Sequence, residues 1–159
     1  MSLIIDMLRE SSLKYPQKTA LRRKSAGTWT DYSYELVWGT SDRIAAGLAE
    51  WGVERGDRVA ILGSSSPFWV MSYLGILKSN AIAVPIDKDL KQGELRHILA
   101  DCEARVLFTE QSYTEIIHDI TDNLPPVMGE SNRLEQVFID LVVNARDAME
   151  AKKMQMMGK

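Results

Sequence analysis

The middle of the chain alternates three short apolar runs with two segments of helical periodicity. The runs at 58–62, 81–85 and 105–109 are mainly apolar, as in strands buried on both faces of a parallel sheet. One intervening segment, 66–79, begins with a capping hydroxyl and a first-turn proline, and the other, 92–101, repeats apolar residues at helical spacing. This strand-helix order needs right-handed crossovers. The sequence therefore predicts an α/β fold with a partial parallel sheet and flanking helices.

The residues on either side of this unit predict further helices and a hairpin. Pro16 ends a first amphipathic helix, and Ser25-Ala26-Gly27 separates two short segments rich in Thr, Trp and Tyr. Gly52 follows a longer helix, where a left-handed C-terminal cap is usual. The predicted helices are 3–14, 34–51 and 113–120, and the predicted hairpin strands are 19–24 and 28–32.

Charge and cysteine content exclude several classes of protein. The net charge is −3, and the only short basic run, Leu21 to Lys24, is interpreted as a solvated strand end, so no nucleic-acid partner is predicted. Cys102 is the sole cysteine, which excludes an intrachain disulfide and a cysteine-based zinc cluster. Neither a signal peptide nor a transmembrane segment is predicted, and cytoplasm is the expected location.

Two adjacent prolines, Pro125 and Pro126, mark a change of pattern. Beyond them, an apolar stripe from Leu134 to Ala148 predicts one more helix. The sequence is accordingly divided into a first domain at 1–120, a linker at 121–131, a helix at 132–153 and a tail at 154–159.

An ordered set of motifs in the first domain resembles one enzyme superfamily. The motifs are Lys14 to Leu21, Trp29 to Leu36, Ala45 to Leu48, Gly52 to Ile61, Tyr73 to Lys78, Val84 to Ile86 and Glu94 to Asp101. Together they resemble the N-terminal part of AMP-forming acyl-CoA synthetases, in the adenylate-forming superfamily, over residues 3–119. The resemblance implies a parent that activates a fatty acid or related carboxylate as acyl-adenylate, using ATP, Mg²⁺ and CoA.

The sequence lacks the catalytic motifs of that superfamily. Nothing matches its Ser/Thr/Gly-rich phosphate loop ending in Pro-Lys-Gly, its acidic ATP-ribose motif or its C-terminal lysine. The triplet Ser64 to Ser66 is interpreted as a helix cap, because a phosphate cradle needs glycines that let successive N–H groups converge. No catalytic residue and no cofactor is therefore expected for the isolated chain, which is predicted to be inactive alone.

A second resemblance covers residues 122–153. Leu124 to Phe138 and Ile139 to Met149 resemble the N-box helix of sensor histidine kinases, in the GHKL ATPase superfamily. Asn144 matches the family's Mg²⁺ ligand, and Asp140 lies one helical turn before it. The resemblance implies Mg-ATP binding through this pair, although histidine kinases have Asn and GHKL hydrolases have Glu at position 140. From the residues alone, the same polar stripe is typical of a solvated helix border.

Three hypotheses for function follow. The first is a ligase fragment, the second is a self-associating or partner-binding module, and the third is a remnant Mg-ATP binder. A partial parallel sheet has open edges and an uncovered apolar face, which predicts a homo-oligomer. His97 and His118 are expected on helix surfaces, and the four tryptophans are expected to pack in or beside the core.

Overall fold

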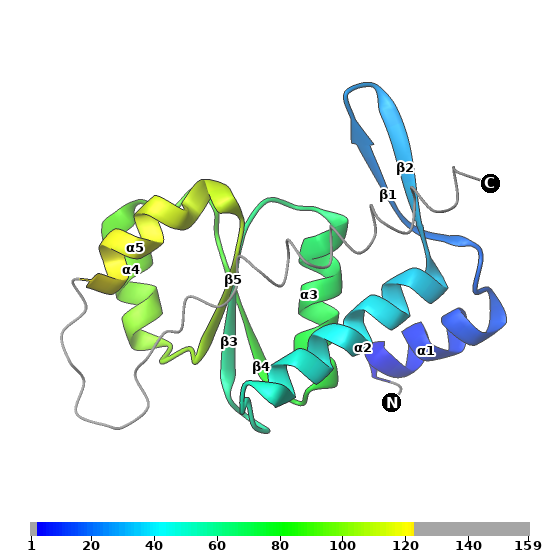
Figure 1. Cartoon of the computed structure of the whole chain (residues 1–159), viewed down its shortest axis with the longest axis horizontal. Helices are drawn as coiled ribbons and strands as arrows, with labels where there is room; N and C mark the ends of the chain where they lie inside the picture. Colours follow the sequence, from blue (N-terminus) through cyan, green and yellow to red (C-terminus); the bar gives the residue numbers. More distant parts are fainter. Residues whose placement is uncertain (1–2, 123–159) are drawn as a thin grey trace.

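The computed structural model describes residues 3–122, which form an α/β unit with a separate β-hairpin (Figure 1). The helices are α1 (Ile4–Lys14), α2 (Tyr34–Glu50), α3 (Pro67–Lys78), α4 (Gln92–Asp101), the 3₁₀ turn η1 (Gln111–Tyr113) and α5 (Thr114–Asp122). The strands are β1 (Thr19–Ser25), β2 (Thr28–Ser33), β3 (Arg58–Leu62), β4 (Ile82–Ile86) and β5 (Val106–Thr109). The predicted order of elements is confirmed for these residues.

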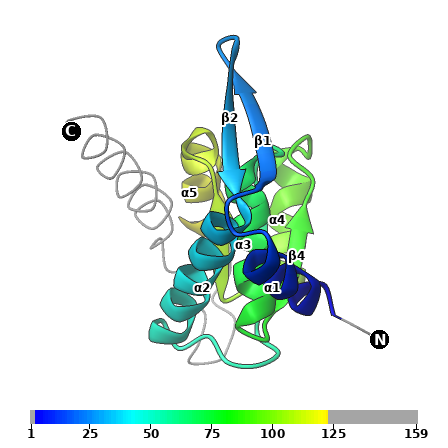
Figure 2. The same ribbon diagram turned by 90° about the vertical axis from the view of Figure 1, so that its right-hand side faces the viewer.

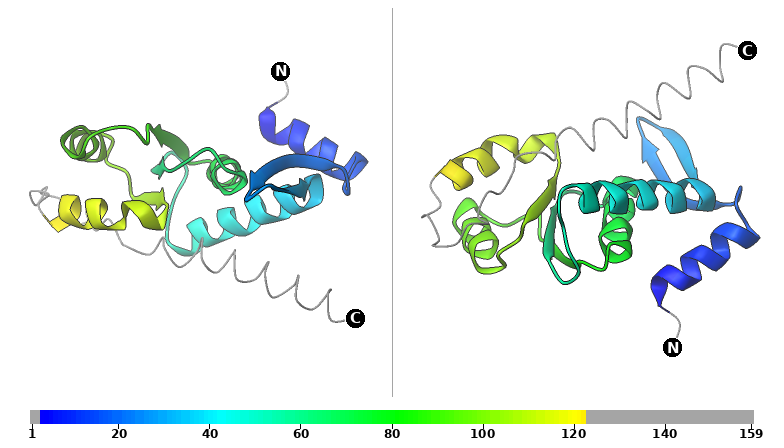
Figure 3. Two further views of the ribbon diagram at one scale, coloured as in Figure 1. Left: turned by 90° about the horizontal axis from the view of Figure 1, so that it is seen from above. Right: turned by 60° about the horizontal axis from the view of Figure 1, so that its bottom comes forward.

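The parallel sheet has the order β4-β3-β5, so the first strand of the unit is central. Alternate residues of β3 face opposite sides, where two apolar clusters form. Val59 and Ile61 pack with α2 and α3, whereas Ala60 and Leu62 pack with α4 and α5. Figure 3 shows the two helix layers on either side of the sheet, so the predicted uncovered apolar face is wrong for the sheet of the described residues. The α/β class predicted from the alternation is therefore confirmed.

Strand β4 is one edge of this sheet and contains Pro85. The N–H of Ile82 donates to the carbonyl oxygen of Asp57, immediately before β3, at 2.8 Å. Since alternate residues of a strand bond to opposite neighbours, Val84 and Ile86 also point their N–H groups toward β3. The backbone at Pro85 faces away from β3, so the N–H group that proline lacks would have pointed outward from the edge of the sheet. Proline is tolerated at such a position.

Helices α2 and α3 lie in close contact, and Gly75 is at their closest approach. A methyl group built at Gly75 would lie 2.5 Å from Cγ2 and 2.7 Å from Cβ of Ile44. Ile44 and the neighbouring Ser41 are buried, and the Ser41 carbonyl oxygen would lie 3.2 Å from the same methyl group. Glycine is therefore required at this position by the packing of the two helices.

At the amino end of the sheet, Asp57 joins the loop before β3 to Arg105, the residue before β5. Its Oδ2 atom accepts from the backbone N–H of Glu54 at 2.7 Å and from Nη1 of Arg105 at 2.7 Å. Arg105 also donates to the carbonyl oxygen of Gly52 at 2.9 Å. The Glu54 N–H, and then Arg105, lower the pKa of the Asp57 carboxyl group, because both favour its charged form.

The hairpin of β1 and β2 projects from the body of the molecule (Figure 2). Ala26 and Gly27 form its two-residue turn with φ of 47° and 82°, as a tight hairpin requires. Leu21 and Tyr32 attach its base to the core cluster that includes α2 and α3. Trp29, further out, is 58% exposed, so the prediction that all four tryptophans pack in or beside the core is wrong for this residue.

Candidate functional site at the carboxyl edge of the sheet

The connections of the sheet reverse direction at the boundary between β3 and β5. The chain passes from β3 to β4 on one side and returns to β5 on the other, which pairs Leu62 with Thr109 at the ends of the strands. In open α/β sheets, ligands bind outside the carboxyl ends of the strands at such a switch point. This edge is therefore the candidate site within the described residues.

The loop after β3 presents hydroxyl and N–H groups to this edge. Ser66 ends the loop as the N-cap of α3, with its Oγ atom accepting from the N–H of Trp69 at 3.1 Å, and Pro67 begins the helix. The cap predicted from Ser66-Pro67 is confirmed. A side chain at Gly63 would lie 3.3 Å from Cγ of Glu110, so the glycine leaves space for that residue.

Glu110 follows β5 and closes over this loop. Its Oε1 atom accepts from the backbone N–H of Ser64 at 2.9 Å, and its Oε2 atom lies 3.2 Å from Oγ of Ser64. A phosphate group entering the loop would have to displace this carboxylate and would be repelled by its charge. The loop therefore holds an anion supplied by the chain itself, which the sequence alone did not reveal.

The loop after β4 reaches the same edge with two exposed lysines, Lys88 and Lys91. Nζ of Lys88 lies 2.6 Å from Oδ1 of Asp89, and this hydrogen bond raises the pKa of the lysine. Asp87 belongs to the same loop and accepts from the N–H of Asp89 at 3.0 Å. The loop therefore carries two carboxylates and two lysines, Lys88 and Lys91, and Glu110 leaves the edge with one net negative charge. Residues 3–122 contain no group of three His, Cys, Asp or Glu residues suited to a metal ion.

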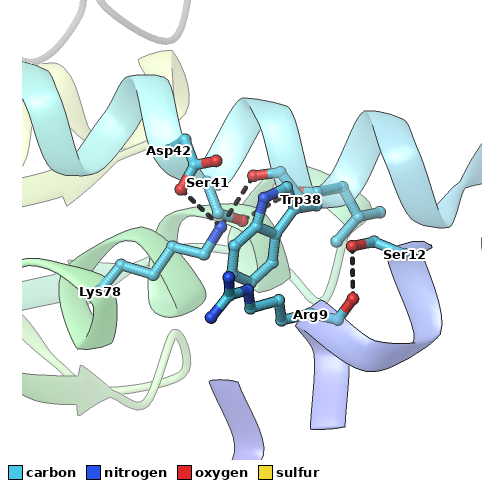
Figure 4. Close-up of polar contacts among 7 residues, drawn as sticks. Arg9, Ser12, Trp38, Ser41, Asp42 and Lys78 are labelled. Atoms are coloured by element: carbon cyan, nitrogen blue, oxygen red, sulfur yellow. Dashed lines mark hydrogen bonds and ion pairs between the residues drawn. The ribbon is translucent and has the colours of Figure 1, made fainter. Parts of the chain in front are cut away.

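A second polar cluster lies between α2 and α3, away from the carboxyl edge (Figure 4). Nζ of Lys78 donates at 2.9 Å to the carbonyl oxygen of Trp38 and at 2.9 Å to Oδ1 of Asp42. It also lies 3.1 Å from the centroid of the Trp38 ring, and the lysine side chain is 6% exposed. Burial lowers the pKa of Lys78, although Asp42 opposes that effect. With so little exposed surface, this lysine joins two helices and has no room for a substrate.

The predicted Mg-ATP residues, Asp140 and Asn144, lie outside the described residues, as do the helix at 132–153 and the tail. The histidines are within them, and both His97 and His118 are exposed on helices, as predicted. Of the tryptophans, Trp38, Trp51 and Trp69 are half-buried, which confirms the predicted packing for these three. No helix of residues 3–122 has the length and apolarity needed to cross a membrane.

Comparison with known proteins agrees with this architecture. The AMP-binding enzyme family matches residues 8–156, which include the segment predicted to resemble a histidine kinase; that second resemblance stays a prediction. The long-chain-fatty-acid–CoA ligase FadD15 of Mycobacterium bovis is 30% identical over 120 residues, covering 75% of this chain and 20% of the ligase. The fatty acid–[acyl-carrier-protein] ligase ScoC of Streptomyces coeruleorubidus is 34% identical over 102 residues, covering 62% of this chain and 20% of that ligase.

A solved structure extends the likeness to the fold. The N-terminal domain of FACL13 from Mycobacterium tuberculosis is superimposable with a TM-score of 0.74 at 26% identity, covering 92% of this chain and 36% of that domain. The chain thus spans about a fifth of the length of the ligases it resembles and about a third of one N-terminal domain. From its sequence and its fold, this chain belongs to the AMP-binding enzyme family.

Proposed function

We propose that these residues are the first part of a ligase that activates a fatty acid or a related carboxylate as acyl-adenylate. The family match over residues 8–156 carries this proposal. Two relatives are ligases of fatty acids, which favours that substrate class, and the family resemblance implies ATP, Mg²⁺ and CoA for the complete enzyme. A cytoplasmic location is part of the same proposal.

We further propose that the 159-residue chain does not form an adenylate alone. Attack of a carboxylate on ATP needs cations or N–H donors that stabilise charge developing on the phosphates. At the carboxyl edge, Glu110 accepts from the N–H of Ser64, and Lys88 is paired with Asp89. Elsewhere in the described part of the chain, the buried Lys78 is engaged by Asp42. These contacts leave the candidate site with excess negative charge, which opposes binding of a nucleotide.

Pyrophosphate release tests this proposal. The 159-residue chain, incubated with ATP, Mg²⁺ and fatty acids of several lengths, is expected to release no more pyrophosphate than the same mixture without protein. A complete long-chain ligase in the same assay shows that release is detectable. Pyrophosphate release by the chain that depends on added fatty acid would contradict the proposed inactivity, and acyl-adenylate in the products would confirm that contradiction.

Self-association is a second candidate function, favoured by apolar side chains on the outer side of α1. Leu3, Ile4 and Met7 are each more than half exposed, whereas Ile5 and Leu8 of the same helix pack against the core. A surface of this kind on a small domain favours association. Light scattering is expected to give a mass above the 17.9 kDa of one chain, falling toward that value for Ile4→Ser/Met7→Ser. A monomeric mass at every concentration would contradict this proposal.

A further inference from the structure

The outer part of the β1–β2 hairpin is a projecting cationic element. Residues 22–31 are all exposed, and the hairpin extends away from the helices that hold its base (Figures 1 and 2). These ten residues contain Arg22, Arg23, Lys24 and Asp31, giving an excess of positive charge in a chain whose net charge is −3. The hairpin therefore has the opposite sign of charge from the chain as a whole.

The strand register places an aromatic ring among these cations. Lys24 is opposite Trp29, and Arg22 is opposite Asp31, so all four side chains share one face of the hairpin. Nζ of Lys24 lies 5.6 Å and the guanidinium carbon of Arg22 lies 5.9 Å from the centroid of the indole ring. The ring still has 58% of its surface exposed. An exposed indole flanked by cations is the main feature of this face.

The ion pairs leave part of the positive charge of the hairpin available to a ligand. Arg22 is paired with Asp31, and that pairing raises the pKa of the arginine and lowers the pKa of the carboxyl group. Within residues 3–122, neither Arg23 nor Lys24 belongs to an ion pair. Arg23 points to the opposite face from Trp29, since strand residues alternate, so both faces near the turn carry an available cation.

We propose that this hairpin docks tip-first on an anionic lipid bilayer. Indole rings favour the headgroup region, where their apolar surface and N–H group are both accommodated. Lys and Arg side chains are attracted by the negative potential of anionic lipids, each strengthening binding roughly fivefold. A nucleic acid is disfavoured because the patch is too short for several successive phosphate contacts. This inference rests on the hairpin and does not depend on the proposed ligase function.

Sedimentation with lipid vesicles tests the proposal. The 159-residue chain is expected to sediment with vesicles of phosphatidylglycerol and phosphatidylcholine, and to stay in solution with phosphatidylcholine alone. Arg23→Gln/Lys24→Gln is expected to weaken binding roughly twenty-five-fold, the product of two losses of about fivefold. Trp29→Ser is expected to weaken binding without changing charge, which separates the indole from the cations.

A charge-matched control gives the test its specificity. Arg55→Gln/Lys91→Gln removes two exposed cations outside the hairpin and changes net charge by the same amount. This control is expected to bind vesicles like the unaltered chain, and circular dichroism verifies folding of every variant. No binding to anionic vesicles, or equal losses in both double variants, would overturn the proposal. Affinity for single-stranded DNA that falls in the hairpin variant while vesicle binding is unchanged would assign the surface to nucleic acid and also overturn it.

Discussion

Gly75→Ala is expected to lower the free energy of unfolding by about 3 kcal/mol, at the upper end of the usual cost of overpacking. The added methyl group would lie 2.5 Å from Cγ2 of Ile44 and 3.2 Å from the carbonyl oxygen of Ser41. Neither neighbour is the free end of a flexible side chain, because Ile44 is buried in the core and the other atom is helix backbone. Relief requires α2 and α3 to move apart, which loosens one of the two apolar clusters.

Gly39→Ala is the matched control for that substitution. Gly39 lies inside α2, and the nearest atom to an added methyl group is Nη1 of Arg43 at 3.8 Å, an ordinary contact with a mobile side chain. Alanine favours the helix over glycine by about 0.5–1 kcal/mol, so this variant is expected to be as stable as the parent or more so. Both are measured by urea unfolding. Equal midpoints for the Gly75 and Gly39 variants would contradict the predicted close approach of the helices.

Lys78→Glu is the second substitution with a large expected effect, a loss of about 3 to 5 kcal/mol. The new carboxylate would face the carboxylate of Asp42 and the carbonyl oxygen of Trp38, which both accept hydrogen bonds from Lys78. It would also place negative charge in the last turn of α3, where a cation is favourable. Urea unfolding followed by circular dichroism measures the loss.

Lys78→Met separates charge from packing at the same site. Methionine keeps an unbranched apolar side chain at this position, and it removes the cation that lies over the Trp38 ring and whose pKa is already lowered by burial. Asp42 is 53% exposed and stays hydrated when its partner is removed, so the loss is expected to be about 1–2 kcal/mol, mainly from the lost hydrogen bond to Trp38. If Met and Glu at position 78 reduce stability equally, repulsion from Asp42 is not the cause.

Local patterns in the sequence predicted most of the elements of this fold. The bounds of β3 and α4 were predicted correctly, because an apolar run and a helical repeat are visible in the residues themselves. The strand predicted at 81–85 begins one residue later, at Ile82. The reason is that the N–H of Ala81 bonds back to the carbonyl oxygen of Ile76 in α3 and so completes the helix end.

The contacts of the candidate site, and those of the second polar cluster between α2 and α3, could not be predicted in the same way. Glu110 meets Ser64 across 46 residues, and Lys78 meets Asp42 across 36 residues. These pairs depend on which strands become neighbours and on how helices cross, and no local pattern specifies either. Trp29 was misassigned for a related reason: its size predicts burial, but its position opposite Lys24 places it beyond the point where the hairpin leaves the body.

Pro85 makes the β4 edge of the sheet less favourable than the β5 edge for pairing with an additional strand. The outer side of β4 lacks one backbone donor, whereas β5, which forms the opposite edge, contains no proline. A strand added beside β4 would lack one backbone hydrogen bond, worth about 0.5–1.5 kcal/mol, and a strand added beside β5 would not. An additional strand, from another segment of polypeptide or from a second molecule, is therefore favoured beside β5. Glu110 begins the next turn at the end of that strand.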